Sequence, residues 1–206
     1  MGLKALVIYS LVVVFLWIGT LALLQRLPIG SELDFIQTMR SPARDQVFKW
    51  VTRLGEIWLY LLLAILYVSR REYTKLKQLG LLGILVVVIS IGLKYYFAQP
   101  RPALAWAGFS AMKGIPGVQW MATWDSFPSG HTMSAIVLAG WLAWEGRNGW
   151  VAALLAVMAG MVGLSRIYLA EHFLKDVSMG MITGLALVWV FYRVLWSMKR
   201  ERFHSG

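Results

Sequence analysis

The chain has 206 residues, of which 59% are hydrophobic and only 15% charged, and it carries 11 tryptophans and a formal net charge of +10. This balance excludes a disordered chain and disfavours a water-soluble domain, whose surface would need more charge. The chain has no cysteine, which excludes disulfides, thiolate catalysis and cysteine-bound metals. Its positive charge, without a basic arm, favours anionic lipid head groups or a phosphorylated substrate over nucleic acid.

The first apolar run, residues 5–24, has no charged side chain. At about 1.5 Å per residue it is long enough to cross a bilayer core of about 30 Å. A cleaved signal peptide is the alternative, but the run is long for the apolar part of such a peptide and no small-x-small cleavage site follows it. We therefore expect a retained membrane span.

Five further apolar runs follow, and two of them are short for a full crossing. The short runs, 57–68 and 132–144, can extend backwards through 50–54 and 127–131, with polar residues at the membrane interface. The sequence shows neither internal repeats nor low-complexity tracts. It predicts an all-α integral membrane protein, a single domain over residues 1–206 with six transmembrane helices in a bundle. The three remaining runs are 79–98, 150–169 and 177–196.

Residues 41–54, "SPARDQVFKWVTRL", mix apolar residues and cations at helical spacing. This pattern is typical of a helix that lies at the membrane interface. A loop followed by an early start of the second span fits the same residues. Both interpretations stay open.

The orientation follows from the placement of lysine and arginine. Alternating spans would put ten such residues on each side, so their number decides nothing. The compact basic segments "RREYTKLK" and "MKRER" stand at span ends and are typical of cytoplasmic loops. We expect a multi-pass protein of the plasma membrane, which in a bacterium is the inner membrane. We expect both termini to be cytoplasmic.

Three polar clusters stand where an odd-numbered span ends or the next even-numbered span begins. In a chain that weaves through the membrane, these points lie on one face. Each residue alone fits a structural role, such as an interface anchor or a helix cap. Their coincidence on one face favours a functional site, because ionisable groups in membrane segments are usually functional. The clusters are Lys94 with Arg101; Ser129, Gly130 and His131; and Arg166 with His172 and Asp176.

The chemistry of the clusters points to phosphate. The motifs contain no acidic residue to pair with each of Lys94, Arg101 and Arg166, so we expect a bound anion to neutralise these cations. The planar guanidinium of arginine is well suited to phosphate oxygens. Ser129 and Gly130 at a helix start add a hydroxyl, backbone N–H groups and the positive end of the helix dipole. We expect these residues to form a phosphate-binding site.

The histidines supply the reaction. Asp176 stands four residues after His172 and can hold one ring nitrogen, leaving the other to attack phosphorus. His131 can protonate the leaving oxygen. A metal site built from the same three residues is the alternative, but three nearby cations would oppose a divalent ion. We therefore expect no metal and no cofactor.

These residues resemble the phosphatidic acid phosphatase type 2 family, within the vanadium haloperoxidase-like superfamily, and its bacterial membrane lipid phosphatases in particular. The family signature is Lys-x6-Arg-Pro, then Pro-Ser-Gly-His, then Ser-Arg-x5-His-x3-Asp. This sequence matches every position, and its motifs cover residues 94–176. Pro102, Pro128 and Ser165 complete the match.

The resemblance implies a metal-independent phosphatase with a helical core and an extracytoplasmic site. It implies His172 as the nucleophile that forms a phosphohistidine, Asp176 as its orienting partner and His131 as the general acid. The phosphate-binding residues would be Lys94, Arg101, Ser129, Gly130 and Arg166. The sequence departs from the family at Ala170, where glycine is common. Glu171 and Lys175 carry charges without an assigned role, although Glu171 could tune the choice of head group.

We expect a phosphatase that acts on a lipid phosphomonoester or pyrophosphate entering sideways between helices. Candidate substrates are undecaprenyl pyrophosphate, phosphatidylglycerol phosphate, phosphatidic acid and lipid A phosphate. Residues 103–127, rich in Trp and Gly, are expected to form a lid or acceptor loop. The alternatives are a lipid-to-lipid phosphotransferase with undecaprenyl pyrophosphate as donor and, in another class, an anion channel or transporter. Haloperoxidase activity is a remote third. The oligomeric state is not predicted.

Overall fold

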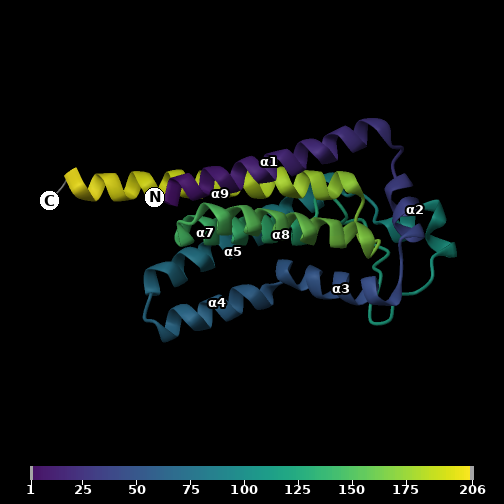
Figure 1. The fold of residues 1–206 in the computed structure, drawn as a ribbon, viewed down its shortest axis with the longest axis horizontal. Helices are drawn as coiled ribbons and strands as arrows, with labels where there is room; N and C mark the ends of the chain where they lie inside the picture. The colour runs from purple at the N-terminus through teal and green to yellow at the C-terminus, as the bar shows by residue number, and fades with distance from the viewer. Residues whose placement is uncertain (1, 205–206) are drawn as a thin grey trace.

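A computed structural model describes the backbone of residues 2–204 and the side chains of residues 2–195. Within this part the chain is helical, without strands, as the sequence predicts (Figure 1). The elements are α1 (Gly2–Arg26), α2 (Ser31–Thr38), α3 (Pro42–Thr52), η1 (Arg53–Gly55), α4 (Ile57–Ser69), α5 (Tyr73–Phe97), α6 (Pro102–Ala105), η2 (Ala107–Ala111), α7 (Gly130–Gly146), α8 (Gly149–Tyr168) and α9 (Leu174–His204).

Each of the six apolar runs lies in a helix of its own. In the described chain, four helical stretches are long and apolar enough to cross a membrane, namely Gly2–Arg26, Tyr73–Ala105, Gly149–Tyr168 and Leu174–Leu195. The pair Pro42–Gly55 and Ile57–Ser69 adds a fifth if it counts as one bent span. The remaining run, 132–144, lies in α7, which has 17 residues. The side chains of the basic segment 198–202 lie outside the described residues.

Helix α7 occupies the centre of the bundle, where it packs against α8, α9, α1 and α5. Small residues allow this close packing. A Cβ atom added at Gly140 would lie 2.8 Å from the Val188 side chain, and one at Gly163 would lie 2.8 Å from the Val177 side chain. Glycine at these two positions thus lets α9 approach both α7 and α8.

Helix α1 is an integral part of the bundle. The buried hydroxyl of Tyr9 donates a hydrogen bond to the Ile136 carbonyl at 2.7 Å. Near the other end of α1, the Thr20 hydroxyl donates to the Ser178 hydroxyl at 3.0 Å. The first apolar run is therefore packed into the bundle along its length.

Residues 42–52 form a helix, as the first interpretation of segment 41–54 predicts. Ser41 caps it by accepting a hydrogen bond from the Arg44 N–H at 3.3 Å, and Pro42 opens its first turn. Proline is favoured there because the first N–H groups of a helix have no partner within it. After η1 the chain bends by 53° before α4. Helix α2 was not expected from the sequence.

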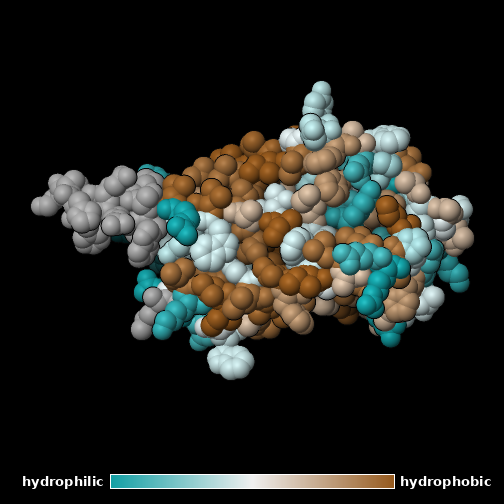
Figure 2. Space-filling view, turned by 90° about the horizontal axis from the view of Figure 1, so that it is seen from above, coloured by the Kyte–Doolittle hydropathy of each residue, from teal (hydrophilic) through white to brown (hydrophobic). Residues whose placement is uncertain are grey.

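The two ends of the molecule differ in character. Both termini lie at one end of the bundle, and α2 with the chain between α6 and α7 lies at the other (Figure 1). Hydrophobic residues cover the middle of the face in Figure 2, and hydrophilic residues gather towards the α2 end. Large apolar side chains such as Phe15, Ile84 and Leu154 are exposed, as a lipid-facing surface requires.

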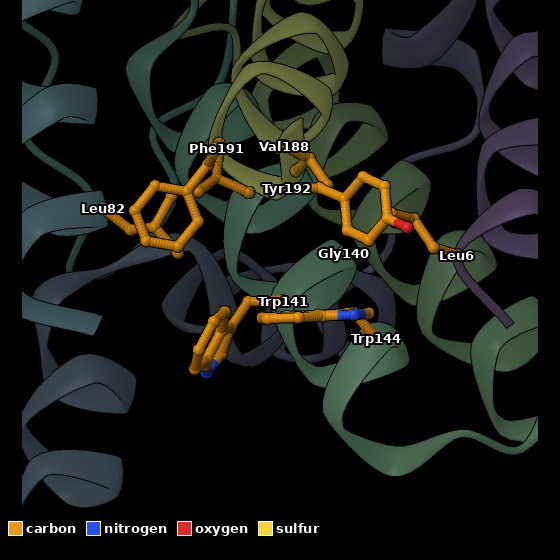
Figure 3. Close-up of a pocket in the computed structure, with 9 residues that line it drawn as sticks. Leu6, Leu82, Gly140, Trp141, Trp144, Val188, Phe191 and Tyr192 are labelled. Atoms are coloured by element: carbon orange, nitrogen blue, oxygen red, sulfur yellow. The ribbon is translucent and has the colours of Figure 1, made fainter. Parts of the chain in front are cut away.

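The end near the termini is closed by packed aromatic rings (Figure 3). Trp141 contacts Trp144 and Phe191 edge-on, with ring centroids 5.1 and 6.0 Å apart, and Trp144 contacts Tyr192 in the same way at 6.0 Å. The cavity among them measures only about 10 Å³, barely enough for one water molecule. These ring contacts hold the helices together, and the cavity among them has no room for a substrate.

Candidate active site

The three sequence clusters meet at the end of the bundle opposite the termini. They stand at the end of α5, the start of α7, the end of α8 and the start of α9. The backbone N–H of Ser129 donates to the Asp176 carbonyl at 2.9 Å. A Cβ atom at Gly180 would lie 2.7 Å from the Ser129 carbonyl oxygen. The second and third motifs are thus held against each other by backbone contact.

His172, Asp176 and Ser126 form a buried group, called here the histidine cluster. One carboxylate oxygen of Asp176, Oδ2, lies 3.4 Å from Nδ1 of His172. The same oxygen accepts hydrogen bonds from the Ser126 hydroxyl at 2.5 Å and from the Phe173 N–H at 2.9 Å. These contacts fix the carboxylate beside Nδ1, so Nε2 is the ring nitrogen left for chemistry.

Burial lowers the pKa of His172 to about 4, although the hydrogen bond to Asp176 acts in the opposite direction. Burial disfavours the charged imidazolium, because the protein interior solvates it less well than water does. The positive charges of Arg166 and Arg101 lower the pKa further. The imidazole is therefore neutral at physiological pH, which is the state that a nucleophile needs.

The start of α7 brings the second motif into the site. Ser129 is fully buried, and its hydroxyl accepts a hydrogen bond from the Thr132 hydroxyl at 2.9 Å. Its side chain does not cap α7, so the capping role considered from the sequence is absent. The first N–H groups of α7 have no side-chain cap. His131 follows directly and lines an apolar groove together with Gly130.

The three cations of the motifs lie together with two carboxylates. This carboxylate–cation cluster consists of Lys94, Arg101, Arg166, Asp125 and Glu171. Arg101 donates from Nε and Nη2 to Asp125 at 2.8 and 3.2 Å, and from Nη1 to Glu171 at 2.8 Å. Lys94 Nζ lies 3.4 Å from Asp125. The expectation that the cations lack acidic partners is wrong, because loop residue Asp125 and Glu171 both reach them.

Arg166 is held less completely. Its Nη1 donates to the Thr52 hydroxyl at 2.8 Å, and its Nη2 lies 3.5 Å from Glu171. Its Nε is buried and has no hydrogen-bond partner among the described residues. A buried donor without an acceptor is costly, so this nitrogen is available to a further anion.

Three positions that the sequence left unexplained now have contacts. Glu171 pairs with Arg101 and Arg166, and the Lys175 amine donates to the Gln99 side-chain carbonyl. Ala170 has a φ of 53°, a left-handed conformation that favours glycine. The departure from glycine at this position therefore places a strained residue beside the site.

Segment 106–129 covers this end of the bundle. The Trp106 indole N–H donates to Asp34 of α2 at 3.0 Å, and the Trp120 indole N–H donates to the Leu169 carbonyl at 2.7 Å. Arg101 N–H also bonds to the Thr123 carbonyl at 3.0 Å. The segment is thus anchored to α2 and to the chain after α8, and it delivers Asp125 to the cations.

Sequence reasoning missed Ser126, Asp125 and Thr52. The only signal was position, since "DS" stands directly before the Phe-Pro-Ser-Gly-His turn. Thr52 carries no signal, because its contact depends on the bend after α3. Among the described side chains, no group of three or more His, Asp or Glu residues is arranged to hold a metal ion.

Several known proteins are similar to this chain. Undecaprenyl-diphosphatase BcrC of Bacillus subtilis is 26% identical over 72% of the chain and 74% of its own length. Phosphatidylglycerophosphatase B of the same organism is 28% identical over the same shares of the two chains. Both relatives are named for the removal of phosphate from a lipid.

Two crystal structures share the fold. Aquifex aeolicus LpxE superposes with a TM-score of 0.64 and 31% identity, covering 78% of this chain and 92% of its own. A PAP2-type phosphatidylglycerolphosphate phosphatase from Bacillus subtilis gives a TM-score of 0.67 and 25% identity, covering 93% and 98%. The apolar helices and these membrane relatives together indicate a membrane protein. The PAP2 superfamily model matches residues 75–200, and the chain therefore belongs to the PAP2 superfamily of phosphatases.

Proposed function

We propose that the chain is a membrane lipid phosphatase that hydrolyses a lipid phosphomonoester or pyrophosphate through a phosphohistidine. The observation that carries this proposal is the histidine cluster beside the cations. His172 is buried, neutral and held through Nδ1, and Arg101 and Arg166 lie within electrostatic range of it. A fixed neutral imidazole next to a cationic phosphate site is suited to nucleophilic attack on phosphorus.

The reaction has two displacements. Nε2 of His172 attacks phosphorus, the bond to the leaving oxygen breaks, and His131 gives that oxygen a proton. Water then attacks the phosphohistidine with His131 as base, which releases phosphate and restores the imidazole. Asp176 stabilises the positive charge that develops on His172. The cations and the N–H groups at the start of α7 stabilise the phosphoryl oxygens. No step requires a metal.

An apolar groove supports a lipid substrate. It has a volume of about 730 Å³ and is lined by α4, α5 and the start of α7. Gly130 and His131 lie along it together with Gly80 of α5. Gly80 is fourteen positions before Lys94, about 21 Å along the helix axis. The groove can therefore hold a long lipid tail while the head group reaches the site from the side.

We further propose that the chain crosses the membrane six times. The bent α3–α4 pair forms one of these crossings and α7 forms another. Helix α7 lies at the bundle centre among the longer helices, which supports its membrane position despite its length. We place both termini in the cytoplasm and the site on the extracytoplasmic face, because the basic segment 70–77 favours a cytoplasmic location. The names of the relatives favour undecaprenyl pyrophosphate and phosphatidylglycerol phosphate among the candidate substrates.

The test measures phosphate release from those lipids in EDTA by the purified full chain. The wild type should release phosphate and His172→Ala should not. Thin-layer analysis with a second lipid present detects a phosphotransferase, which would release little free phosphate. Turnover that EDTA abolishes would refute the metal-free reaction, and unchanged turnover in His172→Ala would refute His172 as the nucleophile. A wild type that releases no phosphate from any of these lipids would favour the anion channel or transporter.

The groove has its own matched pair of variants. Gly80 lines the groove and Gly92 does not, and a Cβ atom at either position meets no atom within 4 Å. Gly80→Trp should raise the KM for a long-chain lipid phosphate about tenfold and leave hydrolysis of a short-chain, water-soluble phosphate ester unchanged. Gly92→Trp should change neither. Equal effects of the two variants would show that the tail binds elsewhere.

A further inference from the structure

The starting observation is that a carboxylate already occupies the phosphate-binding edge of Arg101. Asp125 accepts from Nε and Nη2 of Arg101 with its two oxygens, at 2.8 and 3.2 Å. This is the two-point geometry in which a guanidinium also binds phosphate. Asp125 lies 3.4 Å from Lys94 as well. One loop side chain thus bridges two of the three cations that the proposed function assigns to phosphate.

The two carboxylates of the cluster are held very differently. The side chain of Glu171 is 9% exposed and lies between Arg101 and Arg166, and its backbone N–H bonds to the Arg166 carbonyl at 3.0 Å. The side chain of Asp125 is 40% exposed. Asp125 can turn into water at a lower cost than Glu171, which would have to leave a buried ion-pair network. Asp125 is therefore the carboxylate that can be exchanged.

The charges agree with this exchange. Lys94, Arg101 and Arg166 face Asp125 and Glu171, which leaves one net positive charge in the resting cluster. Departure of Asp125 leaves two. A phosphomonoester carries about −1.5 to −2 near neutral pH, so the cluster with Glu171 alone balances one phosphate group. With both carboxylates in place, the cluster offers one net positive charge, and binding of phosphate would make the total charge negative.

Arg166 offers a second hydrogen-bond donor to an anion. Within the part of the chain that the structure describes, the Nε of Arg166 is buried without a hydrogen-bond partner, although the Nη2 of the same guanidinium faces Glu171. Asp125 pairs with Arg101 and Lys94, whereas the ion pair of Arg166 among the described residues is with Glu171. A tetrahedral phosphate has more acceptor oxygens than a carboxylate and can serve all three cations at once. Exchange of Asp125 for phosphate would thus satisfy a donor that the resting site leaves unpaired.

We propose that Asp125 is an internal anion that holds the phosphate-binding cations in the resting site and is displaced by the phosphate of the substrate. Glu171 stays in place and sets the charge of the site to match a single phosphate group. Asp125 thereby determines how tightly the site binds phosphate. This inference rests on the proposed function only in taking the three cations as the phosphate site.

The test is binding of inorganic phosphate to the detergent-solubilised full chain, measured by calorimetry at pH 7.5. We expect Asp125→Asn, which keeps the shape and removes the charge, to lower the phosphate Kd about tenfold. The variant lacks the negative charge that competes with phosphate for the cations. Glu145→Gln is the matched control. Glu145 pairs with Lys75 at 3.0 Å outside the site, so its variant should bind phosphate like the wild type.

A milder variant covers the case in which Asp125→Asn does not fold. The Thr123 hydroxyl donates to Asp125, so Thr123→Val should loosen Asp125 and lower the Kd about threefold. An unchanged or raised Kd in both variants would overturn the inference, because Asp125 would then support Arg101 instead of competing with phosphate.

The same titrations in a His172→Ala background separate this inference from the proposed function. Phosphate binding needs no turnover, so tighter binding by Asp125→Asn in that background supports the internal anion even if the wild type hydrolyses none of the lipids tested. The opposite outcome is also distinguishable. If the wild type hydrolyses lipid phosphates but Asp125→Asn and Thr123→Val bind phosphate no more tightly than it does, the internal anion is refuted and the proposed function stands.

Discussion

The histidine cluster and the carboxylate–cation cluster lie side by side and are prepared for substrate in opposite ways. In the histidine cluster every contact of Asp176 Oδ2 holds His172 in one orientation, and substrate has nothing to displace. In the carboxylate–cation cluster the donors of Arg101 are already engaged by acids. The nucleophile is preorganised, which lowers the barrier to reaction, whereas the phosphate-binding site must exchange a ligand first.

The largest expected effect comes from the nucleophile. His172→Ala should lower kcat by at least about a thousandfold, because removal of an attacking group leaves only binding and electrostatic stabilisation. Phosphate binding measured by calorimetry should change little, since the cations remain. A kcat within tenfold of wild type would break the distinction between the two clusters.

Asp176→Asn comes next, with an expected loss of about a hundredfold in kcat. The amide keeps the size of the side chain but cannot stabilise the charge that develops on His172. The KM should stay near the wild-type value, because Asp176 contacts no cation of the other cluster. Stopped-time phosphate release at several substrate concentrations separates kcat from KM. A loss confined to KM would contradict the assignment.

Ser126→Ala should have a smaller effect, about tenfold in kcat. Its hydroxyl donates to Asp176 at 2.5 Å, and a hydrogen bond to a charged group contributes about 1.5–3 kcal/mol. Without it the carboxylate is held by the Phe173 N–H alone beside the histidine. Ser126→Thr, which keeps the hydroxyl, is the matched control and should recover part of the rate. Equal losses in both variants would point to packing instead of the hydrogen bond.

The pKa of His172 gives a prediction that needs no substrate. Because burial lowers this pKa to about 4, the ring should stay neutral from pH 8 to about pH 5 and take up a proton only below that. Histidine-selective NMR of the full chain measures the titration, and the signal missing in His172→Ala identifies the residue. A midpoint near the ordinary value of about 6.5 would show that the ring is not desolvated.

The smallest effect concerns the turn that joins the two clusters. Ala170 lies between Arg166 and His172 with a φ of 53°, and a non-glycine residue in this conformation costs about 1 kcal/mol. Ala170→Gly should therefore raise the thermal midpoint by a few degrees and leave kcat unchanged. A lower midpoint would mean that the alanine methyl contributes more packing than strain.

Much of the fold follows from the sequence because long apolar runs have few alternatives. The six runs all form helices, and their ends lie within a few residues of the expected positions except for α5 and α9, which extend further into polar residues. Helix α2 was missed because its residues, "SELDFIQT", are short and mixed in polarity. The bend at Glu56 was missed because it depends on how α3 packs against α8.

The site also combines features that local sequence predicts with features that depend on how the chain packs. The four-residue spacing brings His172, in the turn before α9, beside Asp176 in the first turn of α9. Alternation of spans brings Lys94, Arg101 and Arg166 to one end. The partners of these residues come from the path of a loop, which spacing does not describe. Asp125 and Ser126 are adjacent in sequence, yet one joins the cations and the other joins Asp176. Neither contact can be deduced without the structure.

The most direct test of the account is to trap the phosphorylated protein. The full chain is mixed with a lipid substrate labelled in the phosphate that is released, denatured with alkali within the first turnover, and assayed for label on the protein. Alkali preserves a phosphohistidine, and acid releases it. We predict alkali-stable, acid-labile label on the wild type and none on His172→Ala. Label that persists in His172→Ala, or a wild type that turns over without ever carrying label, would contradict His172 as the nucleophile.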